Sequence, residues 1–253
     1  MIQFSGTNPV YSARYVILTE ECNELPMNLP GYDKVRVIEP DYTSTSGHSQ
    51  SSLGVNGLAC SRGEETLIRN INFTVHEGEL LQIEGENGSG KSTLLKTLCG
   101  FIAPDAGEIL WGGVDIKTVM DDYLAGMHYV GHSNGIKLGL TCHENLKVAS
   151  ALAGAVRTTD LVYVLDQYGL VSHADTPAQF LSSGQRRRLA LARLSVCQAQ
   201  IWILDEPFTS LDENGKVFVK AIFAQHLASG GIIIMTSHEN IRWDGIDIMR
   251  INL

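Results

Sequence analysis

A glycine-rich run that ends in lysine and serine carries the strongest chemical signal in the chain. Between residues 85 and 92 the sequence matches the pattern G-x-x-x-x-G-K-[S/T] at every fixed position. Glycines let the backbone approach phosphate oxygens, and successive N–H groups at a helix N-terminus supply positive potential. Lys91 would lie near the β- and γ-phosphates of ATP, while Ser92 offers a hydroxyl to Mg²⁺. We therefore predict a phosphate-binding loop made of Gly85, Glu86, Asn87, Gly88, Ser89, Gly90, Lys91, Ser92 and Thr93.

Two adjacent carboxylates, Asp205 and Glu206, follow the apolar stretch Ile201–Leu204. An apolar strand can simply end in solvated carboxylates, but a phosphate-binding loop in the same chain favours a catalytic interpretation. We expect Asp205 to hold Mg²⁺, directly or through water, beside Ser92. We expect Glu206 to polarise the water that attacks the γ-phosphate.

The elements that must position these residues alternate between strands and helices. Short apolar runs are typical of buried strands of a parallel sheet, and the intervening polar-apolar stretches are typical of helices. This alternation predicts an α/β fold built on a parallel sheet. The expected strands are Glu79–Glu84, Met127–Val130, Ile201–Leu204 and Ile232–Thr236, and the expected helices are Lys91–Leu98, Thr159–Tyr168, Gln185–Ser195 and Gly215–Ala228.

Size and composition limit the kinds of protein that the chain can be. Its 253 residues suffice for a large core, and 44% apolar with 19% charged residues indicates a globular protein. A net charge of -9 argues weakly against nucleic acid as a partner. The 5 cysteines form no C-x-x-C pair, which suits a reducing compartment without a metal framework. No apolar run approaches the length of a membrane helix, so we expect any membrane role to go through a partner.

The N-terminal part differs from the rest. Residues 1–53 contain two weak strand-like stretches and a polar tract, Thr43–Ser52, that is typical of a linker. The segment has the features of neither a transit peptide nor a secretory signal. We treat it as an extension of unassigned role and place the nucleotide-binding domain at residues 54–253.

A third motif points to one class of ATPase. Leu181-Ser182-Ser183-Gly184-Gln185 opens a helix about twenty residues before Asp205 and resembles the L-S-G-G-Q signature of ABC ATPases. Considered by itself, it would be ordinary helix N-capping. The resemblance implies a P-loop core with an antiparallel β portion near residues 55–84 and a helical subdomain near 121–185. It also implies that the signature residues of one chain contact the ATP bound by a second copy.

The same resemblance assigns roles to four further residues. Asp212 lies where ABC ATPases have the D-loop at the dimer interface, and His238 lies where they have the switch histidine that positions Glu206 and water. Two positions depart from the usual pattern. Arg62 replaces the aromatic residue that stacks on adenine, and its guanidinium can stack instead. Ser133 stands where a glutamine usually contacts Mg²⁺ and senses the membrane partner, so we identify it as the shorter Q-loop equivalent.

The segments around these departures resemble one subfamily, the haem-exporter ATP-binding subunits of cytochrome c maturation (the CcmA family). They are residues 78–85, 131–146 and 201–209. The resemblance implies an ATP-hydrolysing subunit that acts as a homodimer with integral membrane subunits, on the cytoplasmic face of the inner membrane. In that family, hydrolysis is linked to release of a haem-loaded chaperone. We expect Mg²⁺ to enter with ATP and expect no haem on this subunit.

Alternatives remain within and outside transport. The chain could serve an ABC transporter for another substrate, or it could be a soluble ABC ATPase of the iron–sulfur assembly type. A nucleotide-sensing scaffold without hydrolysis is disfavoured, because Glu206 and His238 are both present.

Overall fold

The computed structural model of the chain describes residues 52–62, 65–153, 160–197, 199–237, 243, 246 and 248–253. Residues 1–51 and the predicted switch residue His238 lie outside this range. Ser52 and Leu53, the last residues of the predicted N-terminal extension, begin the first described strand.

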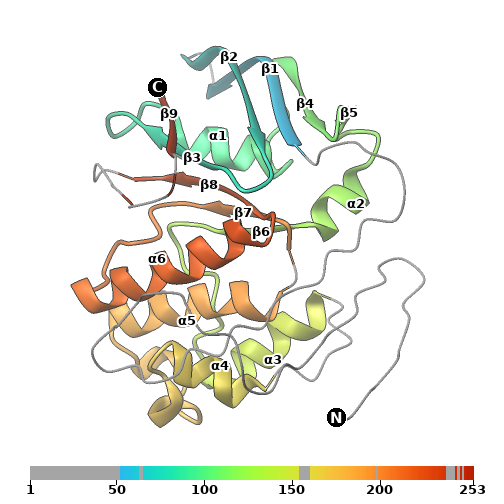
Figure 1. Cartoon of the computed structure of the whole chain (residues 1–253). Helices are drawn as coiled ribbons and strands as arrows, with labels where there is room; N and C mark the ends of the chain where they lie inside the picture. Colours follow the sequence, from blue (N-terminus) through green and yellow to red (C-terminus); the bar gives the residue numbers. More distant parts are fainter. Residues whose placement is uncertain are drawn as a thin grey trace, which may run out of the picture. The chain divides into compact units, whose positions relative to one another are not determined.

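The described elements follow one another as strands and helices along the chain (Figure 1). In order, they are β1 (Ser52–Arg62), β2 (Glu65–His76), β3 (Leu80–Glu84), α1 (Lys91–Leu98), β4 (Ala106–Trp111), β5 (Val114–Asp115), α2 (Met120–Ala125), β6 (Met127–Val130), α3 (Cys142–Leu152), α4 (Leu161–Gln167), η1 (Val171–His173), η2 (Ala178–Phe180), α5 (Ser183–Val196), β7 (Ile201–Leu204), α6 (Glu213–Ala228), β8 (Ile232–Thr236) and β9 (Ile248–Asn252).

A parallel sheet of five strands forms the centre, in the order β6-β7-β8-β3-β9. The predicted strands Met127–Val130, Ile201–Leu204 and Ile232–Thr236 are confirmed, and β3 lacks only Glu79 of its prediction. Strands β7 and β8 are buried along their whole length, as continuous apolar runs in a parallel sheet must be. Because all strands point the same way, the segments that follow β3, β6, β7 and β8 emerge at one edge.

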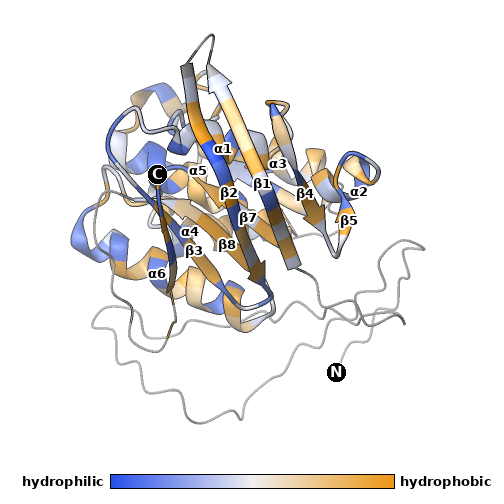
Figure 2. Cartoon of the chain, turned by 90° about the horizontal axis from the view of Figure 1, so that it is seen from above, coloured by the Kyte–Doolittle hydropathy of each residue, from blue (hydrophilic) through white to orange (hydrophobic). Residues whose placement is uncertain are grey.

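A second, antiparallel sheet has the order β2-β1-β4-β5. Figure 2 shows β2, β1 and β4 side by side, with α1 behind them. The predicted antiparallel portion, residues 55–84, is right for β1 and β2 but wrong for β3. Strand β3 belongs to the parallel sheet because Leu80 and Leu81 are buried on its opposite faces, in two different cores.

The two cores divide the helices between the two faces of the parallel sheet. Helix α1 packs with the antiparallel sheet through Leu94, Leu95 and Leu98. Helices α3, α4, α5 and α6 pack on the other face, where Trp202 and Leu204 of β7 point. Helices α3 and α4 both pack on α5 (Figure 1). No helix among the described residues is long and apolar enough to cross a bilayer.

The core under α6 contains a buried histidine. The His226 ring stacks on Trp202, with centroids 3.6 Å apart and planes 5° apart. Burial lowers the pKa of His226 to about 4, although a hydrogen bond to the Gln200 carbonyl oxygen opposes this change. The folded protein therefore keeps this imidazole neutral down to a pH at which the unfolded chain, with a histidine pKa near ~6.5, is protonated.

We predict that this histidine makes the protein less stable in acid. As pH falls from about 6.5 to 4, the unfolded chain binds a proton that folded His226 does not, so the free energy of unfolding falls by up to about 3 kcal/mol. His226→Phe keeps a ring on Trp202 but removes this contribution, so its urea-unfolding free energy should decline less across the same pH range. His76→Gln, a change at an exposed histidine, should follow the wild type. Equal pH dependence in the Phe variant would contradict the argument.

Candidate functional site

The phosphate-binding loop joins β3 to α1 in a backbone conformation that needs glycine. Gly85 has φ 143°, and a Cβ there would lie 2.6 Å from Ser89 Oγ and 2.8 Å from the Leu253 carbonyl oxygen. Gly90, at φ 103°, is the N-cap of α1, and no side chain caps this helix. The N–H groups of the first turn of α1 are therefore not used by a cap, as an anion-binding helix start requires.

The Lys91 side chain folds back over this loop. Its Nζ donates hydrogen bonds of 2.8 Å to the carbonyl oxygens of both Gly85 and Glu86, and the residue is buried. A buried ammonium that donates to neutral carbonyls is a strong attractor for phosphate oxygens. Geometry and charge thus place a cation where the sequence predicts the β- and γ-phosphates.

Asp205 and Ser92 meet although 113 residues separate them. Ser92 Oγ donates a hydrogen bond to Asp205 Oδ2 at 2.9 Å, and Thr236 Oγ1 donates to Asp205 Oδ1 at 2.7 Å. The two predicted metal-binding residues thus lie together, at the shared edge of β7, β8 and the phosphate-binding loop. Thr236, the last residue of β8, was not predicted. Its signal was available, because it ends a buried strand adjacent to the one that ends before Asp205.

Glu206 has an unusual backbone conformation. Its φ is 50°, in the left-handed region, and its N–H donates to Thr236 Oγ1 at 2.9 Å. Thr209 Oγ1 donates to Glu206 Oε2 at 3.1 Å, which fixes the direction of the carboxylate. A non-glycine residue held in this region marks a position that the surrounding structure determines, and such positions are frequent at active sites.

Sequence reasoning missed Arg187, which lies buried between α5 and the segments after β6 and β7. Its guanidinium donates to the carbonyl oxygens of Gly131, Asp205, Glu206 and Pro207 and to Asn134 Oδ1, over 2.7–3.2 Å. Burial lowers the pKa of Arg187 to about 10, although nearby Asp205 and Glu206 oppose this change, so the group remains a cation at pH 7. Its helical spacing was a signal: position 187 falls on the apolar stripe that contains Ala190, Leu191 and Leu194.

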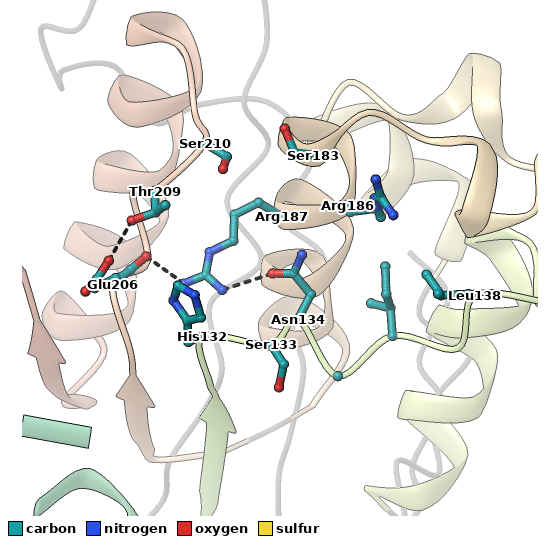
Figure 3. A pocket seen from close by; sticks show the side chains of 12 residues that line it. His132, Ser133, Asn134, Leu138, Ser183, Arg186, Arg187, Glu206, Thr209 and Ser210 are labelled. Atoms are coloured by element: carbon teal, nitrogen blue, oxygen red, sulfur yellow. Dashed lines mark hydrogen bonds between the residues drawn. The ribbon is translucent and has the colours of Figure 1, made fainter. Parts of the chain in front are cut away.

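Glu206 and Arg187 border a hollow of about 390 Å³ (Figure 3). Ser133, the predicted Q-loop equivalent, is exposed on its rim together with His132. Ser183, at the start of α5, lines the same hollow from the other side.

The signature residues form a capping box at the start of α5. Ser182 Oγ accepts from the Gln185 N–H at 3.2 Å, and Gln185 Oε1 accepts from the Ser182 N–H at 2.8 Å. A Cβ on Gly184 would lie 2.7 Å from the Ser210 carbonyl oxygen, so this turn packs tightly on the segment after Glu206. Ser182 and Ser183 are exposed, and α5 packs on the face of the sheet opposite to α1.

The remaining predicted residues have other surroundings. Asp212 caps α6, where its side chain accepts from the Gly215 N–H at 3.0 Å. Arg62 ends β1, but its side chain lies outside the described residues, as does the whole of His238. Among the described residues, no cluster of three or more His, Cys, Asp or Glu side chains could hold a metal ion.

Comparison with known proteins gives one family. The model of the family described as ABC transporter matches residues 68–209. The chain is 48% identical over 193 residues to the "Cytochrome c biogenesis ATP-binding export protein CcmA" of Nitrosococcus oceani, covering 76% of this chain and 88% of that protein. It is 44% identical over 201 residues to the protein of the same name from Escherichia coli K12, covering 79% and 96%. Among solved structures, a putative ABC transporter ATP-binding protein from Pyrococcus furiosus has a TM-score of 0.70 at 27% identity, covering 80% of this chain and 98% of its own.

We predict that the hydroxyl group of Thr236 stabilises the folded protein. Thr236→Val removes the hydroxyl that connects Asp205 Oδ1 to the Glu206 N–H. Because it leaves two polar groups without this partner, we expect the free energy of unfolding to fall by about 1–3 kcal/mol, measured by urea unfolding at pH 7. Thr236→Ser keeps the hydroxyl and should lose much less. A Val variant as stable as the wild type would show that the bridge contributes nothing.

Proposed function

Because this chain belongs to the ABC transporter family as its ATP-binding subunit, we propose that it hydrolyses MgATP as one half of a head-to-tail dimer. The observation that carries the proposal is the meeting of Ser92 with Asp205, directly beside the buried Lys91. That constellation combines a phosphate-binding cation with the two oxygen groups that a nucleotide-bound metal requires.

The residues present fit a magnesium ion that enters with ATP. Ser92 Oγ and Asp205 Oδ2 converge to 2.9 Å, and hydroxyl and carboxylate oxygens are the hard ligands that Mg²⁺ prefers. When bound, the ion would neutralise charge on the β- and γ-phosphates. The chain itself contributes Lys91 and the first-turn N–H groups of α1 on the phosphate side.

Glu206 would act as the group that orients and polarises the attacking water. The hydrogen bond from Thr209 and the backbone hydrogen bond to Thr236 hold its carboxylate at the end of β7. His238, directly after Ser237 in the sequence, would contact the γ-phosphate and help to position this water.

The second half of each site would come from another copy of the chain. Ser182, Ser183, Gly184 and Gln185 form a capped helix start with exposed serines, on the opposite face of the sheet from this chain's own α1. A γ-phosphate would then connect the two chains, and hydrolysis would release them. Asp212 would lie at the dimer interface. The Arg62 guanidinium would stack on adenine, and Ser133 would face the membrane partner.

The relatives indicate the process that this ATPase serves. Proteins named for cytochrome c biogenesis and export share 40–48% identity with the chain over about three quarters of its length. We infer that it drives an ABC membrane complex of cytochrome c maturation from the cytoplasmic face of the inner membrane. Haem export, or release of a haem-loaded chaperone, would be the step supplied with energy, without haem binding to this subunit.

Glu206→Gln should trap the ATP-bound dimer. Glutamine still accepts the Thr209 hydrogen bond but cannot take a proton from water, so we expect kcat for ATP hydrolysis to fall at least ~10²-fold. Light scattering after size exclusion should show a MgATP-dependent dimer. Adding Lys91→Ala to this variant removes the phosphate contact and should abolish the dimer. Normal turnover by Glu206→Gln, or a monomer under saturating MgATP even with membrane partners present, would contradict the proposal.

Purification from native membranes tests the assignment to a process. We expect a tagged chain to co-purify with multi-helix membrane proteins of cytochrome c maturation, identified by mass spectrometry, because the relatives that share 40–48% identity with it are named for cytochrome c biogenesis and export. Deletion of the gene for this chain should prevent accumulation of haem-bearing c-type cytochromes, measured by haem staining. Recovery only with soluble iron–sulfur scaffold proteins would overturn the assignment but leave the ATPase mechanism intact.

A further inference from the structure

We propose that Arg187 is a positioning residue that links the signature turn of a chain to Glu206 of the same chain. The inference rests on the proposed ATPase function and deepens it, because it assigns the element that couples the two nucleotide sites of the dimer.

The hydrogen bonds of Arg187 use the whole guanidinium group. Arginine has five N–H donors, and here Nε donates to Pro207 O, Nη2 to the carbonyl oxygens of Asp205 and Glu206, and Nη1 to Gly131 O and Asn134 Oδ1. The carbonyl oxygens of three consecutive residues therefore accept hydrogen bonds from one buried cation. Figure 3 shows this guanidinium with Glu206 and Asn134. This arrangement fixes the backbone at Glu206, where φ is 50°.

Helix α5 connects Arg187 to the signature turn. Arg187 lies in the second turn of α5, a helix of 14 residues whose N-cap is Ser182. Because Ser182 caps the helix that contains Arg187, we expect a displacement of Ser182 and Ser183 to displace Arg187 as well. Farther along α5, Arg193 Nη1 donates to the Asn134 and Gly135 carbonyl oxygens at 3.4 and 3.3 Å, which holds the helix to the segment after β6 a second time.

In the proposed dimer, Ser182 and Ser183 contact ATP held by the partner, while Glu206 acts on ATP held by its own chain. Through Arg187, ATP binding at one site would therefore change the position of Glu206 at the other site. Because Ser133 replaces the longer glutamine on the rim of the same hollow, Arg187 supplies a link between these segments that does not depend on that side chain.

The test compares Arg187→Gln and Arg187→Lys with Arg188→Gln in the complex purified from membranes. Arg188, the next residue of α5, is partly exposed and does not line the hollow. For both Arg187 variants we expect kcat to fall at least ~30-fold and the Hill coefficient for ATP to approach about 1, with the Kd for MgATP within about two-fold of wild type. Unchanged Kd also shows that the variants fold, and Arg188→Gln should resemble the wild type.

Lysine separates a positional from a purely electrostatic role. It keeps the positive charge but cannot reach several carbonyl groups in fixed directions. If Arg187→Lys restores kcat and cooperativity, charge is sufficient and the positioning role is overturned. Wild-type kcat in Arg187→Gln overturns the inference while leaving the ATPase proposal standing, whereas absence of hydrolysis in the wild-type complex removes both.

Mixed dimers, isolated with two different affinity tags, test which Glu206 is held. When one chain carries Glu206→Gln and its partner carries Arg187→Gln, the only intact Glu206 has lost its own Arg187, and we expect little hydrolysis. When both substitutions are in one chain and the partner is wild type, hydrolysis should equal that of a wild-type chain paired with Glu206→Gln. Equal activity of the two arrangements would refute a link within one chain.

Discussion

The carboxylate of Asp205 is the point on which the site depends. One of its oxygens accepts from Ser92 in the phosphate-binding loop, and the other accepts from Thr236 at the end of β8. A single buried charge thereby connects two neighbouring strands with the loop that holds Lys91. Neither hydroxyl provides a full counter-charge, so in the proposed mechanism this carboxylate would bind the cation that enters with nucleotide.

A second buried charge organises the region behind Glu206. Burying the guanidinium of Arg187 is unfavourable unless each donor finds an acceptor, and the chain supplies backbone carbonyl oxygens from two loops to meet this requirement. The stability of the loops and the position of Glu206, the proposed catalytic residue, therefore depend on the same hydrogen bonds. Asp205 lies beside Ser92, and Arg187 lies on the side of α5.

Much of the fold and the outline of the site could be predicted from sequence. The strands Met127–Val130, Ile201–Leu204 and Ile232–Thr236 are short, mostly apolar runs flanked by glycine or polar residues, so pattern and length predicted them. The partner strands of β3 could not be predicted, because pairing across the sheet is a long-range property. Arg187 and Thr236 carried local signals, a basic residue on the apolar stripe of α5 and a polar residue at the end of a buried strand. Their roles were missed because their hydrogen-bond partners are distant in sequence.

The left-handed backbone at Glu206 is strained for the residue that occupies it. Glycine or asparagine would occupy this φ with less strain, by roughly 1 kcal/mol or more, than the residue that is present. At position 206 the proposed chemistry thus favours glutamate, whereas the backbone conformation favours glycine or asparagine. If turnover were abolished, replacing this carboxylate by glycine would relieve the strain, so a loss of activity at this position can accompany a gain in stability.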